Sequence, residues 1–355
     1  MQKMEALMHQ FDYRFLAELL PAGMAGLSNI IYDLKGRNEV RRLENEPLFL
    51  KLREKAVIQS AVGSNAIEGV STSGERIHEL LEKDAAPLTH DEKEILGYKK
   101  ALQEIYQDGF RGDLSESLIL HLHHTLLEGT SPEAGKYKRR DNWIQERSPD
   151  GSIHVRFVPV SAQEVPAAME QWILAYREAR QEAAISPLLL IACAVQDFLC
   201  IHPFMDGNGR VSRLLTVLLL QQEGFDIVRY ISLEEKIYQY RDAYYTALKA
   251  SSAGWHENTA DYVPAMTFLL QVLYSCYKDL DQKFLDREAK RIPKAKQIEV
   301  LLAQSFVPIS KNDISQKLPE ISISTIERVL GQLMKDGKIE KIGDFKNARY
   351  RSLNQ

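Results

Sequence analysis

The chain has 355 residues, of which 45% are hydrophobic and 26% are charged, and its formal net charge is −4. This composition is typical of folded globular proteins and excludes a disordered chain, and the length predicts two or three domains. The longest apolar run, residues 188–195, is far shorter than the roughly 20 residues that cross a bilayer, so no membrane segment is expected. The N-terminal residues do not resemble a secretory leader, and the three scattered cysteines favour a reducing compartment; we expect a cytoplasmic protein.

Helices are predicted for most of the chain. Apolar residues recur at spacings of three and four through the first 108 residues, for example at Leu16, Leu19 and Leu20. The same pattern predicts helices over residues 115–127, 163–182 and 188–200, with Pro187 at the start of the last. Cys193 and Cys200 lie among apolar residues of that helix, and we expect them in the core.

Residues 135–159 interrupt the helical pattern. A Ser-Pro-Asp-Gly turn signal at 148–151 lies between short segments with β-branched and aromatic residues, which predicts a β-hairpin inserted between helices. Its first arm is polar, so we expect the hairpin to lie on the surface as a flap.

The rest of the chain predicts a loop at 202–210, a helix over 211–222 that ends at Gly224, and a long connector helix over 260–289. After Pro293, helices are predicted over 295–304, 311–317 and 322–335, followed by strands in 337–351. Three helices followed by a hairpin is the order of a winged helix-turn-helix. The fold class is therefore mostly α, and the predicted division is an N-terminal helical region (1–110), a core with the connector helix (111–292) and a winged-helix domain (293–355).

The predicted loop contains the run HPFMDGNGRVSR, residues 202–213, which has the parts of a phosphate site. Gly207 and Gly209 flank Asn208 and leave the backbone N–H groups free to converge on an anion at the start of a helix. Arg210 and Arg213 are three residues apart, so both are expected to project towards that anion. The lesser alternative is a glycine-rich helix entry that only turns the chain.

Two further residues of the run supply chemistry. Asp206 is a carboxylate next to the phosphate cradle, where it is suited to hold Mg²⁺. His202 has an ordinary pKa near neutrality and is suited to take a proton from an attacking hydroxyl. Together these residues predict phosphoryl or nucleotidyl transfer.

The run resembles the signature of the Fic family, HPFx[DE]GNGRxxR, at every fixed position, and the resemblance covers about residues 115–274. Most members move AMP from ATP to a Ser, Thr or Tyr hydroxyl of a protein, in some cases their own, and release pyrophosphate. The resemblance implies that His202 is the base, that Asp206 holds Mg²⁺, and that the remaining residues bind phosphates. Those are Gly207, Asn208, Gly209, Arg210 and Arg213. The intact GNG favours AMP transfer over the related Doc kinases, which lack it.

An upstream run, SNAIEG at residues 64–69, resembles the inhibitory motif [ST]xxxE[GN] of the same family. Ser64 and Glu68 are four residues apart and share a helical face, and Gly69 is a plausible helix stop. The resemblance implies that Glu68 pairs with Arg213 and keeps it from the γ-phosphate of ATP, so that the chain inhibits itself. Glu68 as an ordinary helix-end charge is the alternative.

The resemblance also implies that the flap binds the target protein by pairing of main chains, with Val155 and Phe157 on the docking segment. Downstream, Tyr245 is favoured slightly over Tyr244 as a contact of the nucleotide, and packing is as good an explanation for either. His121 and His124 are expected to be surface or packing residues, since no third metal ligand has suitable spacing.

Other functions stay open. Residues 294–355 contain eleven Lys or Arg and seven Asp or Glu, a net charge of +4 that would suit DNA binding through helix 322–335 and a wing with Lys341, Lys346, Arg349 and Arg351. A transcription regulator with a nucleotide-sensing core is therefore one alternative, and a hydrolase that removes AMP from proteins is another. Homo-oligomers and use of other nucleotides are compatible with the sequence.

Overall fold

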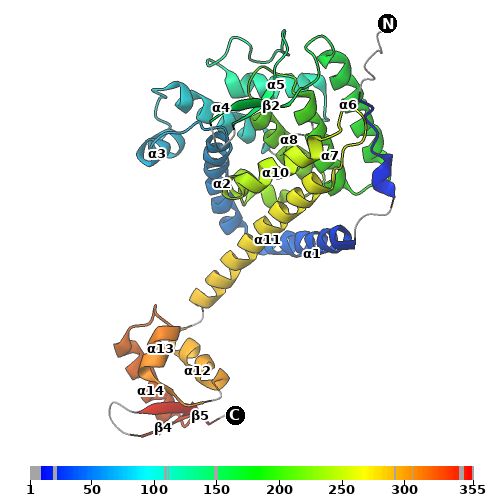
Figure 1. The fold of residues 1–355 in the computed structure, drawn as a ribbon. Helices are drawn as coiled ribbons and strands as arrows, with labels where there is room; N and C mark the ends of the chain where they lie inside the picture. Colours follow the sequence, from blue (N-terminus) through cyan, green and yellow to red (C-terminus); the bar gives the residue numbers. More distant parts are fainter. Residues whose placement is uncertain are drawn as a thin grey trace. The chain divides into compact units, whose positions relative to one another are not determined.

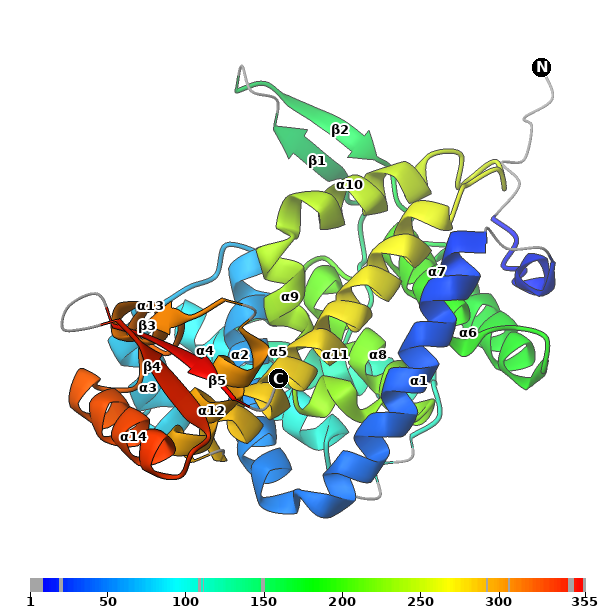
Figure 2. The same cartoon turned by 90° about the horizontal axis from the view of Figure 1, so that it is seen from below.

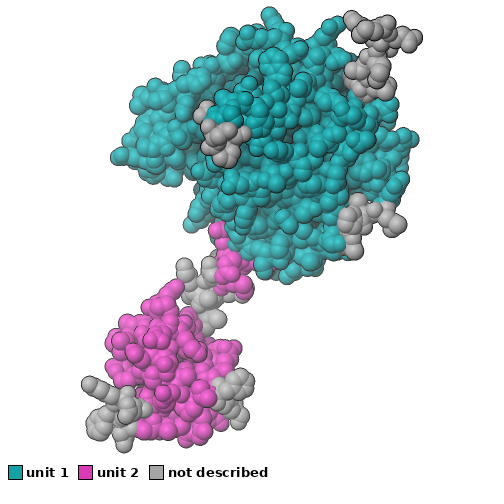
Figure 3. Space-filling model, in the orientation of Figure 1, with its two compact units in different colours: residues 1–280 teal, residues 281–355 magenta. Residues whose placement is uncertain are grey.

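A computed structural model of the chain describes residues 9–18, 22–107, 110, 112–147, 151–291, 293–305, 307–343 and 348–353. It divides into two compact units, residues 1–280 and 281–355, which Figure 3 distinguishes by colour. No helix in the described part of the chain is both long enough and apolar enough to cross a membrane.

The first unit opens with helices, as the spacing predicts (Figure 1). They are η1 (Arg14–Ala17), α1 (Ala22–Glu44), α2 (Glu46–Ile67), α3 (Gly74–Glu82) and α4 (His90–Ile105). Side-chain oxygens of Ser73 and Thr89 accept hydrogen bonds from backbone N–H groups in the first turns of α3 and α4, which explains where these helices begin. α2 packs so closely against the helix of residues 233–239 that a Cβ at Gly63 would lie 2.9 Å from the backbone nitrogen of Glu235.

The centre of this unit is a buried pair of helices in the middle of the chain. They are α7 (Pro187–Ile201) and α8 (Asn208–Gln222), between which lies the loop of residues 202–207. α7 is apolar on nearly every side, and both of its cysteines, Cys193 and Cys200, are free and buried, as expected. α5 (Glu116–Leu127) and α6 (Val165–Gln181) precede the pair.

The hairpin consists of β1 (Ile144–Arg147) and β2 (Ile153–Phe157), paired antiparallel, and Figure 2 shows it projecting from the helices beside α10. Three of the four residues of its predicted turn, 148–150, lie outside the described residues. The unit is completed by η2 (Asp226–Arg229), α9 (Leu233–Gln239), α10 (Arg241–Ser252) and most of α11 (Val263–Arg291). Helices from both predicted parts, 1–110 and 111–292, pack into this one unit, and the predicted three-part division stays a prediction.

The second unit contains α12 (Lys294–Gln304), β3 (Ile309–Ser310), α13 (Lys311–Lys317), α14 (Ile323–Lys335), β4 (Ile339–Ile342) and β5 (Arg349–Ser352). Its sheet has the strand order β3-β5-β4. The short strand β3 was not predicted, because two residues carry no detectable period. The elements follow the order of a winged helix-turn-helix, and membership of that class stays a prediction. Among its described residues, Lys296 and Lys338 pair with Glu299, Lys311 pairs with Glu327, and Arg351 pairs with Glu340. Lys346 of the predicted wing lies outside the described residues.

Candidate active site

The loop between α7 and α8 is built around two left-handed residues. His202 ends α7 with φ 52°, and Gly207 precedes α8 with φ +81°, a conformation that favours glycine. α8 begins at Asn208, three residues earlier than predicted, so Gly209 and Arg210 lie in its first turn. The left-handed turn at Gly207 allows this early start and leaves the unpaired N–H groups of α8 at the site.

Hydrogen bonds from Asn208 of α8 and from the flap segment hold the loop in shape. The Asn208 amide accepts a hydrogen bond from the Phe204 N–H at 2.9 Å and donates one to the Phe204 carbonyl at 2.8 Å. Asn142 donates to that carbonyl at 2.9 Å, and the Lys138 N–H donates to the Pro203 carbonyl at 2.9 Å. The buried side chain of Asn208 therefore shapes the loop, and any anion contact of this residue falls to its backbone N–H.

His123 is a loop-supporting residue that the sequence did not reveal. Its ring stacks on Phe204 with centroids 3.7 Å apart, and the Gly135 N–H donates to its Nδ1. Its Nε2 therefore carries the proton and donates to the Asp206 carbonyl at 3.1 Å. Burial lowers the pKa of His123 to about 4, which keeps this neutral tautomer. Its neighbour His121 is exposed and contacts Glu104, and no metal-type cluster of three His, Cys, Asp or Glu side chains occurs among the described residues.

His202 is arranged as a neutral base. Its Nδ1 lies 3.1 Å from the Leu199 carbonyl, to which it donates, so Nε2 keeps its lone pair. Burial lowers the pKa of His202 to about 4, with a contribution from the positive charge of Lys138 and against the hydrogen bond to Leu199, which raises it. The imidazole is therefore uncharged at neutral pH and able to accept a proton.

A cavity of about 160 Å³ lies beside His202. Its walls combine the start of α8, the end of α2, the flap and α10. The lining includes Glu68, Phe157, His202, Gly209, Arg213, Tyr244 and Tyr245. Both tyrosines thus reach it: Tyr244 is buried, while Tyr245 is 38% exposed and donates to the Ile67 carbonyl at 3.3 Å. Asp206, Arg210 and Val155 are not among the lining residues.

Arg213 is held by the end of α2. Its Nε donates to the Ser64 hydroxyl at 2.8 Å, and its Nη2 donates to the Ser64 carbonyl at 2.9 Å and to Glu68 Oε1 at 2.8 Å. Its buried Nη1 has no hydrogen-bond partner among the described residues. Burial alone would lower the pKa of this guanidinium, but the Glu68 carboxylate raises it above its ordinary value. The contact that the inhibitory motif implies is present.

Glu68 lies directly over the first turn of α8. It caps the C-terminus of α2, and Gly69 follows it with φ +82°. A Cβ built on Gly209 would overlap Glu68 Oε1. The Glu68 carboxylate therefore occupies the space next to the first turn of α8, where an anion would bind.

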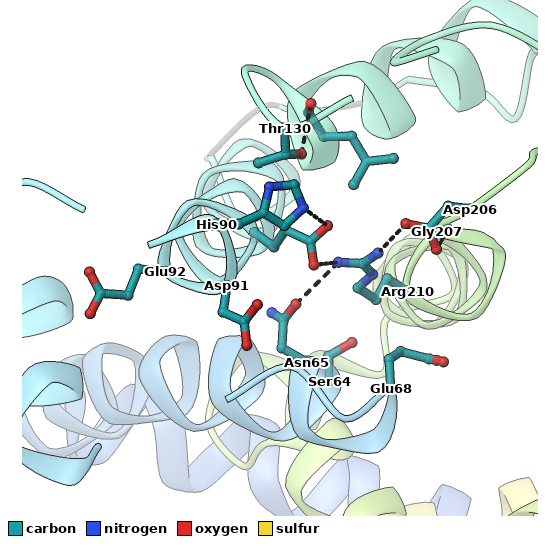
Figure 4. Close-up of polar contacts among 12 residues, drawn as sticks. Ser64, Asn65, Glu68, His90, Asp91, Glu92, Thr130, Asp206, Gly207 and Arg210 are labelled. Carbon is teal, nitrogen blue, oxygen red and sulfur yellow. Dashed lines mark hydrogen bonds and ion pairs between the residues drawn. The ribbon is translucent and has the colours of Figure 1, made fainter. Parts of the chain in front are cut away.

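Arg210 differs from the expectation that both arginines face one anion. Its Nη1 donates to Glu94 Oε2 at 2.7 Å and lies 3.4 Å from Asn65 Oδ1, and its Nη2 donates to Asp206 Oδ2 at 3.1 Å (Figure 4). The guanidinium is turned towards α4 because Glu94, a buried carboxylate that sequence analysis missed, neutralises it there.

Asp206 remains available to a cation. Its side chain is 67% exposed, and its Oδ1 accepts the Gly207 N–H at 2.6 Å. Mg²⁺ binds through one or two carboxylates together with phosphate oxygens and water. An exposed carboxylate beside a helix N-terminus fits that coordination, so the residues present fit a magnesium ion bound together with a nucleotide.

The two flap residues have different surroundings. Val155 pairs with Gln145 and is 50% exposed, as a docking residue requires. Phe157 stacks on His256 with centroids 5.3 Å apart and lines the cavity. Phe157 thus closes one wall of the site, and exposure favours Val155 as the docking position.

Comparisons with known proteins agree with the signature. Residues 113–220 match the model of the Fic/DOC family. Protein adenylyltransferase Fic of Nematostella vectensis is 29% identical over 213 residues, 57% of this chain and 44% of that protein. Its counterpart in Culex quinquefasciatus is 30% identical over 212 residues, 58% of this chain and 39% of that protein. The matched region therefore spans less than half the length of these curated relatives.

Solved structures share the fold. A Fic family protein from Desulfovibrio desulfuricans has a TM-score of 0.64 at 22% identity, and the match covers 96% of this chain and 98% of that one. Fic-1 from C. elegans has a TM-score of 0.56 at 20% identity, covering 72% of this chain and 70% of that one. The signature and the family model thus agree over the region that contains both, residues 113–220, and the solved structures share the fold of the chain.

Proposed function

We propose that this protein transfers AMP from ATP to a hydroxyl group of a protein and that Glu68 inhibits the transfer. One observation carries the proposal: Glu68 lies over Gly209 and holds Arg213 in the same cavity that presents the neutral base His202. The base His202, the anion site at Gly209 and Arg213, and the inhibitory residue Glu68 thus line the same cavity.

The chemistry follows from these groups. The target hydroxyl oxygen attacks the α-phosphorus of ATP, the bond from that phosphorus to the β-phosphate oxygen breaks, and pyrophosphate leaves. His202 Nε2 takes the hydroxyl proton, for which its neutral state at pH 7 is required. In-line transfer depends mainly on positioning and on stabilising charge, and the N-terminus of α8 and Arg213 supply both.

Asp206 is the residue that would hold Mg²⁺ with the nucleotide. Bound there, the cation would neutralise phosphate charge, the chemistry that such transfers need. Tyr244, Tyr245 and Leu248 on α10 form an apolar wall suited to a nucleobase.

Inhibition follows from the space that Glu68 occupies. Its carboxylate places a negative charge beside the first turn of α8 and pairs with the guanidinium that a γ-phosphate would use. The phosphates and the Glu68 carboxylate compete for one partner, so ATP binds productively only where Glu68 is displaced.

Protein substrates are proposed to pair with the flap through the edge of β2 that faces away from β1, with this chain among the candidate targets. The exposed side chains of Ile153 and Val155 suit such docking. A hydrolase that removes AMP is the rival use of the same site, in which Glu68 would orient water.

The test is intact-mass analysis of the Glu68→Gly protein after incubation with Mg²⁺ and each nucleoside triphosphate. We expect AMP adducts with ATP, and none in Glu68→Gly combined with His202→Ala. Glu128→Gly is the matched control, since Glu128 also caps a helix C-terminus but pairs with Lys100 at the surface. Removal of AMP from a modified protein, abolished by Glu68→Gly, would favour the rival instead.

A further inference from the structure

Glu94 and Arg210 form a buried ion pair behind the loop. The Glu94 residue is 4% exposed and Arg210 is 2% exposed, and their side chains meet at 2.7 Å. A charge so deeply buried is tolerated only with a partner, and each residue supplies the charge that the other needs. α4 thus holds the first turn of α8 by an electrostatic contact.

Arg210 contacts Asp206 as well as Glu94. The nitrogen that does not face Glu94 donates to Asp206 Oδ2 at 3.1 Å, so one planar guanidinium joins the two carboxylates (Figure 4). The backbone of Asp206 is held separately, by the hydrogen bond from His123 to its carbonyl. The Asp206 carboxylate is therefore exposed to solvent on one side and oriented by Arg210 on the other.

Glu94 differs from the inhibitory residue Glu68 in its position. Glu68 lines the cavity and its side chain is 33% exposed, whereas the Glu94 side chain is 6% exposed and neither it nor Arg210 lines the cavity. A gate has to leave its partner when the ligand arrives. Burial on both sides of the Glu94–Arg210 contact indicates a permanent support.

We propose that Glu94 is a positioning residue that, through Arg210, orients Asp206 and sets its affinity for a divalent cation. This inference rests on the proposed function, in which Asp206 holds that cation. With Glu94 ionised, the positive charge of Arg210 is balanced and the negative charge of Asp206 remains for the metal. Without the charge of Glu94, Arg210 repels the cation and competes for Asp206, so both effects weaken metal binding.

The experiment compares Glu94→Gln with Glu92→Gln in the full chain carrying Glu68→Gly. Glu92 is the matched control because it lies on the same helix and is equally buried, but it pairs with Arg76 of α3 at 2.9 Å and points away from Arg210 (Figure 4). Binding of Mn²⁺ is measured by electron paramagnetic resonance, alone and with α,β-methylene-ATP. Activity is measured separately against Mg²⁺ and against ATP.

We expect Glu94→Gln to raise the Kd for Mn²⁺ about 10–100-fold, as loss of a residue that orients a metal ligand does, and Glu92→Gln to leave it unchanged. The half-saturating Mg²⁺ concentration should rise in parallel, while the KM for ATP at saturating Mg²⁺ stays near its starting value. Glu94→Asp, which keeps the charge, should show a smaller loss in the same direction and decides the matter if Glu94→Gln does not fold.

Three results would overturn the proposal. The first is an unchanged Mn²⁺ affinity in Glu94→Gln, and the second is an equal loss of Mn²⁺ affinity in the Glu92→Gln control. The third is a rise in activity in Glu94→Gln, which would make Glu94 a second inhibitory residue. Failure of the proposed function is distinguishable from these, since it appears as normal Mn²⁺ and nucleotide binding without AMP transfer.

Discussion

Glu68 Oε1 lies where the side chain of residue 209 would begin, so its carboxylate and a methyl group at that position exclude each other. Gly209 therefore does two things in this structure: it leaves the start of α8 open to an anion, and it makes room for the Glu68 carboxylate. The proposed inhibition can therefore be tested by substitutions at Glu68 and Gly209, some of which should raise activity or stability while others lower it.

Replacing Glu68 by glycine should raise AMP transfer, although most changes in an active site lower activity. Loss of the carboxylate frees Arg213 and opens the space over Gly209 to phosphate. The measurement is the rate of AMP incorporation from labelled ATP. Combining the change with Arg213→Ala should remove the gain, and activity no higher than wild type in the single variant would refute the inhibition while leaving the Fic assignment intact.

The same variant should be less stable without nucleotide. Arg213 is buried and would lose its carboxylate while keeping its hydrogen bonds to Ser64, and removing one partner of a buried ion pair costs about 3–5 kcal/mol. ATP with Mg²⁺ supplies a new anion and should raise the Tm of Glu68→Gly more than that of wild type. Calorimetric scans with and without nucleotide test this, and equal shifts for both proteins would contradict it.

Gly209→Ala should destabilise the wild-type protein and stabilise the Glu68→Gly variant. In wild type the new methyl group collides with Glu68, so the variant should unfold more easily. In the Glu68→Gly background this collision is gone and a 3.3 Å approach to Arg213 Nη1 remains, while alanine in a helix is favoured over glycine by up to about 1 kcal/mol. A double-mutant cycle from chemical denaturation measures the coupling, and additive effects would show that the two groups do not touch.

The pH dependence of transfer should reflect the lowered pKa of the half-buried His202. Its pKa of about 4 lies below the ordinary histidine value, so the competent neutral form persists down to that pH. As the pH is lowered, kcat/KM should therefore fall near pH 4 and not near pH 6.5. An NMR titration of the ring gives the pKa directly, and His202→Ala should lower the rate about 10²–10⁴-fold while leaving ATP binding largely intact.

The sequence predicted the local chemistry of the loop, and the one distant contact that it gave, Glu68 with Arg213, came from the resemblance to a family motif. His202, Asp206 and Arg213 could be found because their chemistry is concentrated in twelve residues of a recognisable signature. Glu94 could not, because it lies 116 residues from Arg210 and resembles any other glutamate of a charged helix. Its burial depends on how α4 packs beside α8, which periodicity does not reveal.

Helix and flap details show the same limit. The sequence predicts that this helix begins at about Val211, whereas the left-handed Gly207 lets α8 begin at Asn208. The turn signal and the β-branched and aromatic residues on either side of it predict the hairpin, but the stacking of Phe157 on His256 depends on a loop almost a hundred residues later. Side-chain roles that depend on such contacts need the fold.

Val155 provides the clearest test of the flap. Replacing it by proline removes a backbone N–H and should impair labelling of protein targets more than binding of ATP, because Val155 is half exposed and does not line the cavity. Phe157→Asp should impair both, since Phe157 lines the cavity and packs on His256. Leu174→Asp on α6, at an equally exposed apolar residue, controls for surface charge. Labelling by gel and nucleotide affinity by calorimetry separate the two effects, and normal labelling of targets by Val155→Pro would show that β2 is not the docking edge.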